Sequence, residues 1–319
     1  MPSAFVENIC LSFLLDAQNE DGGWGFHVRS KSRAEPAAWA LLALLECAST
    51  QAHEDAASRA FHFLGVAQLP DGSWPCSPEL REGSWVTSLV CLALLGRNEF
   101  SGNVVRGLDW LCQELPGETR LLRRLIRSFA ARRSVTDQNE SYFGWSWTTG
   151  TASWVEPTAY AIIVMRGTPA ELLPKAARRR LRVGEAMLYD RMCPAGGWNC
   201  GNPMVYGVPG EPQVSSTAWA LLALREHPER PEVQKSLHWL QENLKTIQSP
   251  VSLALALIAM NAHGRRDAAL ADSLQTMYEK NDFPWSVPEV AWTALALCDT
   301  QNWLEQKPNR NESAKRTDD

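Results

Sequence analysis

The sequence predicts an all-α fold, an α/α toroid in which about six helix pairs close into a ring. Three observations predict it: a Gly-Trp turn recurs along the chain, an apolar helix rich in Ala and Leu follows each turn, and an amphipathic helix precedes it. One such unit cannot bury its apolar face alone, so neighbouring copies must stack into a continuous core. We expect a single toroid domain over residues 1–301 and a polar, frayed C-terminal tail over residues 302–319.

The repeat is clearest in its first two copies. Gln18 leads into Asp21-Gly22-Gly23-Trp24, and Gln68 leads into Asp71-Gly72-Ser73-Trp74 fifty residues later. Later copies of the turn end at Trp145, Trp198 and Trp285. The apolar helices that follow these turns are expected around residues 36–44, 85–95, 158–161, 215–224 and 291–297; a sixth, around residues 251–260, has lost its Gly-Trp turn.

The two helices of each unit differ in character. In residues 236–244, Leu237, Leu240 and Leu244 share one face, so this helix buries a single stripe. The helices after the turns are apolar nearly all round, which predicts burial on every side. We therefore expect an outer amphipathic ring around an inner apolar one. Thirteen helical segments are predicted, one more than six pairs use, and the odd one lies in residues 108–133.

Composition excludes several classes of function. The net charge of -5 predicts no general affinity for nucleic acid or anionic membranes. The first residues lack the pattern of a signal peptide, and no apolar stretch is long enough to span a bilayer. The eight cysteines show no dense spacing, so we expect reduced, buried thiols in a cytoplasmic protein.

The motif Gln-x2-Asp-Gly-(Gly/Ser)-Trp followed by Thr-Ala-Trp-Ala-Leu-Leu-Ala-Leu resembles the QW-type repeat of squalene–hopene cyclases. The same toroid serves the β subunits of protein prenyltransferases. The resemblance covers roughly residues 13–297, and the stretch 144–159 resembles an uncharacterised single-barrel bacterial branch. It implies a cavity enzyme of the terpene cyclase/prenyltransferase superfamily that acts on an isoprenoid or other apolar small molecule by acid-initiated cyclisation or isomerisation.

Two departures from the squalene–hopene cyclases matter. Those enzymes have two barrels, and this chain has room for one. Their acid motif is Asp-x-Asp-Asp-Thr-Ala, and the matching stretch here is Trp154-Val155-Glu156-Pro157-Thr158-Ala159. The resemblance places Glu156 on the central Asp, the proton donor of that family, while Trp154 and Pro157 replace the flanking acids.

Glu156 and Glu35 are the candidate catalytic residues. Each precedes a proline at the start of an inner helix. A structural role is also open, because Pro is favoured at the first helical position and a carboxylate there complements the helix dipole. A catalytic acid needs a raised pKa, which only an apolar, water-poor pocket would supply at a helix N-terminus.

Aromatic side chains are the candidate substrate-binding groups, because a carbocation is stabilised by aromatic faces. The alternative is that most of the fourteen Trp are turn anchors, as we expect of Trp24, Trp74, Trp198 and Trp285. The dense loop and the inner helices supply the residues predicted to line a cavity, namely Trp145, Trp147, Trp154, Tyr160, Trp39, Trp219 and Trp292.

Charged and metal-binding candidates are weaker. Arg123 and Arg127 share a helix face that is either solvated or clamps a diphosphate or an acidic partner. The basic run at residues 175–182 is expected on the surface. Cys193 and Cys200, with His227 or His263, do not have a recognised zinc spacing, so no metal and no cofactor are expected.

A non-catalytic scaffold is the rival to the enzyme. It is motivated by the missing Asp-x-Asp-Asp motif, zinc set and second barrel. The long loops 134–155 and 193–214 would then be the surface that contacts a protein partner. Peripheral membrane contact through the mouth of the cavity also stays open. Between the two hypotheses, the candidate acids and aromatic side chains favour an enzyme over the scaffold.

Overall fold

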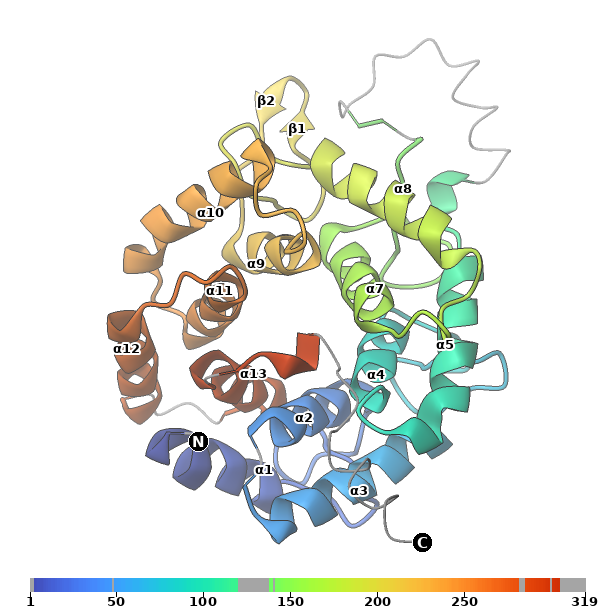
Figure 1. The fold of residues 1–319 in the computed structure, drawn as a ribbon, viewed down its shortest axis with the longest axis vertical. Coiled ribbons are helices and arrows are strands. Elements are labelled where there is room, and N and C mark those ends of the chain that lie inside the picture. The colour runs from blue at the N-terminus through green and yellow to red at the C-terminus, as the bar shows by residue number, and fades with distance from the viewer. Residues whose placement is uncertain are drawn as a thin grey trace, which may run out of the picture.

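The structure, a computed structural model, describes residues 3–47, 49–119, 138–139, 141–280, 285–298 and 300–304. These residues form two concentric rings of helices, so the predicted all-α toroid is confirmed (Figure 1). The apolar helix of each unit lies in the inner ring and the amphipathic helix in the outer ring. Six pairs close the ring within the described part of the chain.

Each inner helix packs against the next, and the last packs back against the first. Small and branched apolar side chains cover these helices on all sides, which is why they are buried nearly throughout. The inner ring consists of α2 (Ala34–Cys47), α4 (Val86–Leu94), α7 (Val155–Gly167), α9 (Val214–Ala223), α11 (Pro250–Ala262) and α13 (Val287–Leu297).

The outer ring covers the inner one with one apolar stripe per helix. Its members are α1 (Ser12–Asp16) continuing from η1 (Val6–Leu11), α3 (Gln51–Val66), α5 (Ser101–Gln113), α8 (Ala177–Asp190), α10 (Pro231–Asn243) and α12 (Ala268–Glu279). Short additions are η2 (Asn98–Phe100), η3 (Gly117–Thr119), η4 (Leu244–Thr246) and the antiparallel hairpin of β1 (Met204–Val205) and β2 (Val208–Pro209).

The odd helical segment predicted in residues 108–133 is only partly described. Its first residues complete α5 in the outer ring. Residues 120–137, which include Arg123 and Arg127, lie outside the described residues.

The Gly-Trp turns bind the two rings together. In four repeats the indole Nε1 donates to a Leu carbonyl in or just after the preceding outer helix, over 2.6–2.8 Å. Gly22 and Gly72 adopt φ values of 83° and 92°, and a Cβ there would lie 2.7 and 2.6 Å from a backbone oxygen of the next outer helix. Glycine is therefore required at that point of the turn. The bonded pairs are Trp24 to Leu14, Trp74 to Leu64, Trp145 to Leu111 and Trp198 to Leu188.

The C-terminal strap, residues 300–304, corrects the predicted start of the tail. Instead of fraying from residue 302, it forms η5 (Asn302–Leu304) and buries Trp303 and Leu304. Glu46 near the end of α2 accepts hydrogen bonds from the backbone N–H groups of Asn302 and Trp303, at 3.0 and 2.9 Å. The polar composition of the segment predicts a frayed tail, whereas the buried indole of Trp303 holds its first residues against the ring.

No helix in the described part of the chain is both long and apolar enough to cross a membrane.

A buried threonine that holds the turn gives a test of this packing. The hydroxyl of Thr217 accepts a hydrogen bond from the backbone N–H of Trp198 at 2.9 Å. Thr217→Val keeps the shape but leaves a buried donor unpaired, so it should lower the free energy of unfolding by about 1–3 kcal/mol. Urea denaturation measures the change. Thr168→Val is the control, because the hydroxyl of Thr168 donates to Val164 within its own helix. Equal losses in both variants would contradict the anchoring role.

Candidate functional site

The inner helices begin at the same end of the ring, which we call the mouth. Backbone hydrogen bonds connect their starts: Val287 N donates to Phe26 O, Trp85 N to Trp147 O, and Val155 N to Cys200 O, at 2.8–3.2 Å. The loops that deliver the helices are therefore tied to one another around the mouth. As a result, equivalent positions of different helices lie at the same height in the ring.

Four aromatic residues share one such position. Each is the sixth residue of its inner helix, counted from the first residue of α2, α7, α9 and α13. We call this set the aromatic layer; it consists of Trp39, Tyr160, Trp219 and Trp292. All four were predicted to line a cavity.

The aromatic layer fills the centre of the ring at its height. The ring of Trp39 on α2 lies 6.2 Å from that of Tyr160, 5.4 Å from that of Trp219 and 5.6 Å from that of Trp292, centroid to centroid. Because α7 and α9 are not neighbours of α2, these contacts cross the ring. Tyr160 and Trp219 close the set at 4.6 Å. Such distances are direct ring contacts, so aromatic side chains occupy the axis.

The two candidate acids lie one helical turn closer to the mouth. Glu35 and Glu156 are each the second residue of their helices, four residues before Trp39 and Tyr160. Residues four apart share a helix face. Burial raises the pKa of Tyr160, and the charges of Glu156 and Glu35 raise it further. The structure thus brings Glu35, Glu156 and the aromatic layer together.

Glu156 has polar partners on the neighbouring helix. The hydroxyl of Ser216 donates to Oε1 of Glu156 at 3.0 Å. Burial raises the pKa of the Glu156 carboxyl, and hydrogen bonds from Ser216 and Ser215 oppose that rise. Neither serine was proposed as a site residue, because the pairing depends on the contact between α7 and α9.

Burial raises the pKa of Glu35 to about 7, although the nearby guanidinium of Arg33 lowers it. A carboxyl with this pKa holds its proton for much of the time at neutral pH. Glu35 therefore has the property that the sequence argument required of a catalytic acid.

Trp85 is an aromatic site residue that sequence reasoning missed. Its ring stacks on Tyr160 at 5.0 Å, and Trp147 packs edge-on against it at 5.1 Å. It stands two residues before Thr87, as Glu156 stands two before Thr158, and both threonines accept from the Trp of their turn. The equal spacing from these threonines could have shown from the sequence that Trp85 occupies the same position as Glu156. Trp147 was predicted to line the cavity. Its ring contacts Trp85, which in turn contacts Tyr160 of the aromatic layer.

Trp145 and Trp154 do not belong to the aromatic layer. Trp145 is a turn anchor bonded to Leu111, buried against the face of Arg180 at 4.1 Å. Trp154 is the N-cap of α7, and its backbone N–H donates to Trp145 O at 3.0 Å. Neither residue contacts another aromatic ring among the ring pairs of the described chain.

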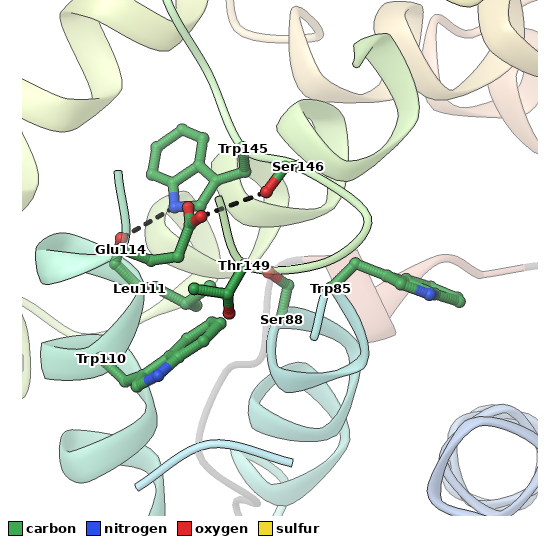
Figure 2. A pocket seen from close by; sticks show the side chains of 8 residues that line it. All are labelled: Trp85, Ser88, Trp110, Leu111, Glu114, Trp145, Ser146 and Thr149. Atoms are coloured by element: carbon green, nitrogen blue, oxygen red, sulfur yellow. Dashed lines mark hydrogen bonds between the residues drawn. The ribbon is translucent and has the colours of Figure 1, made fainter. Parts of the chain in front are cut away.

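Behind Trp85 lies a cavity of about 10 Å³, room for about one water molecule (Figure 2). Its lining includes the carboxyl group of Glu114, which accepts from Ser146 at 3.1 Å. Burial raises the pKa of Glu114. This space is too small for an organic ligand.

Arg180 corrects the prediction that residues 175–182 form a surface run. Its side chain is buried, donating to Glu114 O at 3.2 Å and to Gly144 O at 3.0 Å. Lys175, Arg178, Arg179 and Arg182 are exposed, as expected.

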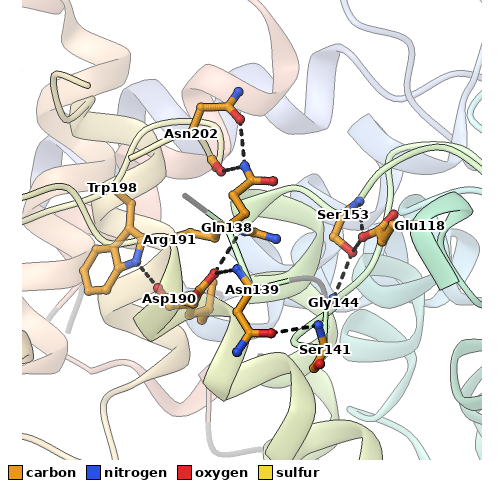
Figure 3. A network of polar contacts seen from close by, with 12 residues as sticks. Glu118, Gln138, Asn139, Ser141, Gly144, Ser153, Asp190, Arg191, Trp198 and Asn202 are labelled. Carbon is orange, nitrogen blue, oxygen red and sulfur yellow. Dashed lines mark hydrogen bonds and ion pairs between the residues drawn. The ribbon is translucent and has the colours of Figure 1, made fainter. Parts of the chain in front are cut away.

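Polar contacts join the two long loops near α8 (Figure 3). Gln138 donates to Gly201 O at 2.6 Å and to Asn202 at 2.7 Å. Asn139 N donates to Asp190, which also pairs with Arg191 at 3.1 Å. The described parts of both loops are therefore built into one wall beside the start of α7.

The metal candidates do not converge. His227 contacts Arg166 at 3.1 Å, and His263 contacts Leu221 O at 3.0 Å. In the described residues, no three His, Cys, Asp or Glu side chains gather closely enough to hold a metal ion.

Neither a protein-family model nor a curated protein matches the sequence. Solved structures do match its fold. The type II terpene cyclase MstE from Scytonema aligns with a TM-score of 0.60 at 15% identity, over 92% of this chain and 96% of that chain. Its complex with the substrate geranylgeranyl dihydroxybenzoate aligns at 0.57 and 15% identity, over 95% and 97%. The ent-copalyl diphosphate synthase from Streptomyces platensis aligns at 0.51 and 18% identity, over 86% of this chain and 50% of that chain. The chain therefore has the α/α-toroid fold that type II terpene cyclases use.

Proposed function

We propose that the mouth of the ring binds an isoprenoid or similar apolar small molecule and starts its cyclisation or isomerisation by protonation. One observation carries the proposal: two carboxyl groups with raised pKa values lie one helical turn above a continuous aromatic layer. The chain would then be an enzyme acting without a cofactor.

The chemistry explains why these groups suit the reaction. Protonating an alkene requires an acid that keeps its proton in a water-poor place. Burial provides this condition at Glu35 and Glu156. The proton adds to one carbon of the double bond, and its partner carbon becomes positive. Aromatic faces stabilise that charge through cation–π attraction.

We assign Glu156 as the proton donor. The hydroxyl of Ser216 donates to Oε1 of its carboxyl group and so orients that group, while burial favours its protonated form. Glu35 is the second catalytic carboxyl: with a pKa of about 7 it is partly ionised at neutral pH, and the ionised form receives the proton that the cation loses at the end of the reaction. Exchange with solvent then returns Glu35 to its ionised form and Glu156 to its protonated form. The proton count then balances, and the product is an isomer of the substrate.

The structural neighbours support this class of ligand. MstE is described with geranylgeranyl dihydroxybenzoate as its substrate and merosterolic acid A as its product. At about 15% identity the likeness supports only the coarse class, an apolar prenylated molecule. Arg123, Arg127, Trp145 and Trp154 are not needed for the proposed chemistry.

A non-catalytic scaffold is the second candidate, favoured by the packed centre of the ring. Its contact surface would include the loop 193–214, where Val205, Tyr206 and Val208 of the hairpin are exposed. A protein partner or a membrane surface would cover these apolar side chains. The scaffold needs neither raised pKa value at the mouth, which is why we favour the enzyme.

The first experiment identifies the ligand and tests the acid. Protein purified without detergent is extracted with organic solvent, and the extract is analysed by mass spectrometry for isoprenoids. The recovered compound, or a prenyl alcohol series if none is recovered, is incubated with the protein and its products are separated by gas chromatography. We expect Glu156→Gln to abolish turnover while the thermal midpoint stays within a few degrees, because the amide keeps the shape but has no acidic proton.

Glu289→Gln is the matched control. Glu289 also lies in the first turn of an inner helix, but it closes a capping box with Ser286, a role that an amide oxygen retains. It should keep full activity. Retained turnover in Glu156→Gln would show that Glu156 is not the proton donor. If the wild type has neither bound isoprenoid nor turnover, the scaffold is favoured.

The raised pKa of Glu35 predicts how stability depends on pH. Its pKa is about 7 in the folded chain against an ordinary 4.5, so the protonated form stabilises the fold. That contribution is complete below about pH 4.5 and is lost as the pH rises through about 7, a loss of about 2 kcal/mol for a partly exposed carboxyl. Glu35→Gln should therefore gain stability relative to the wild type between pH 5 and pH 8, as measured by urea denaturation.

Glu35→Asp retains a titrating carboxyl and should keep the pH dependence of the wild type. If the difference between Glu35→Gln and the wild type is constant across this pH range, burial does not raise the pKa of Glu35.

A further inference from the structure

The space available to a ligand is closed from the far end of the ring. The C-terminal strap crosses beneath the inner helices: Leu304 O accepts from Arg225 at 2.7 Å, and Gln301 donates to Ile258 O at 3.0 Å. The strap places the ring of Trp303, which is 2% exposed, 6.3 Å from the ring of Trp39. The axis is therefore occupied from the strap up to the aromatic layer.

Trp39 is the central member of this packing. It is 0% exposed, and it contacts three aromatic rings from other inner helices as well as Trp303. Within the described part of the chain, its buried indole Nε1 has no hydrogen-bond partner. Packing alone therefore sets its position, and replacing it with an aliphatic residue changes the space in the ring without breaking a polar contact.

Between Trp39 and the mouth, the inner helices have about one further turn, which carries the two acids. Glu35 lies four residues before Trp39, which corresponds to about 6 Å along the helix axis. Half-buried side chains in the first turns of the inner helices include Glu35, Trp85, Glu156, Ser215 and Val251. A ligand that reaches the acids therefore contacts the aromatic layer within one helical turn.

We propose that Trp39 is a specificity-determining residue that restricts the substrate to a short isoprenoid. The inference rests on the proposed function and narrows its substrate class. A longer prenyl chain has to leave its remaining carbons outside the mouth, where they gain no burial. Replacing Trp39 with a smaller residue creates space between the inner helices for those carbons.

A series of prenyl alcohols tests this limit. Dimethylallyl alcohol, geraniol, farnesol and geranylgeraniol each add one isoprene unit, and quenching of the Trp fluorescence at the mouth reports binding. Each carbon that enters an apolar site tightens binding by about fourfold, so affinity should rise steeply while the added unit is buried and level off when the site is full. For the wild-type chain we expect the rise to end at geraniol.

Trp39→Leu should move the end of the rise to farnesol or beyond, with a gain of at least about tenfold in farnesol affinity. Trp39→Phe, which removes less volume, should fall between the two. Phe100→Leu is the matched control, because Phe100 stacks on Phe61 at 5.4 Å between outer elements. It should keep the wild-type profile. If Trp39→Leu does not fold, Trp39→Phe carries the comparison.

The outcomes separate the inference from the proposed function. If the wild type binds geranylgeraniol progressively tighter than geraniol, the limit is overturned while the isoprenoid site stands. If Trp39→Leu binds the series as the wild type does, Trp39 does not set the limit. If no alcohol binds to the wild type or to either Trp39 variant, the isoprenoid site itself is wrong, and the inference falls with it.

Discussion

The hydrogen bond from an indole N–H to a leucine carbonyl of the preceding outer helix is the contact on which the rest of the structure depends. It occurs in four of the repeats with nearly the same length, 2.6–2.8 Å. It fixes the height at which each turn leaves the outer ring, and thereby the height at which the inner helix begins. Without that constraint the inner helices would be free to slide, and Trp39, Tyr160 and Trp219 would not meet on the axis.

The same register decides the electrostatics of the mouth. Glu35 and Glu156 lie in the first turn of their helices, where the helix dipole stabilises a carboxylate by about 0.3–1 kcal/mol and so lowers its pKa. One pKa unit corresponds to about 1.4 kcal/mol, so the dipole is worth less than one unit. Burial of Glu35 moves its pKa by more than that in the opposite direction, even with Arg33 nearby. Desolvation therefore outweighs both favourable charges, because the aromatic layer and the loops exclude water from this level.

The fold was largely predictable, because its signals are local and repeated. A turn of Gly and Trp followed by an apolar helix specifies one unit, and stacking specifies the ring. The aromatic layer was predictable for the same reason, since Trp39, Trp219 and Trp292 stand at one position of the repeat. The density of Trp in residues 145–154 has a structural explanation: Trp145 obeys the repeat and anchors its turn, and Trp154 is the N-cap residue of α7.

Other site residues depend on contacts that the sequence does not reveal. Ser216 matters because α7 and α9 are neighbours, and Arg180 is buried because its guanidinium covers Trp145. Trp303 lies in a segment whose polar composition predicts a free tail, yet its buried indole and hydrogen bonds to Glu46, Arg225 and Ile258 hold the segment in place. Composition averages over a segment, whereas the folded chain responds to single side chains.

The packed centre of the ring is compatible with the proposed catalysis, because the same aromatic side chains would perform two tasks. A toroid with an empty axis would leave apolar surface against water or a void, and voids lose the contacts that stabilise a core. Filling the axis with Trp39, Tyr160 and Trp219 removes that loss. In the proposed reaction the same aromatic side chains would stabilise the positive charge that develops beside Glu35 and Glu156. If the proposed function holds, the stability of the ring and the small size of the site are two consequences of one layer, and the part of the axis that the layer occupies sets the size of the site.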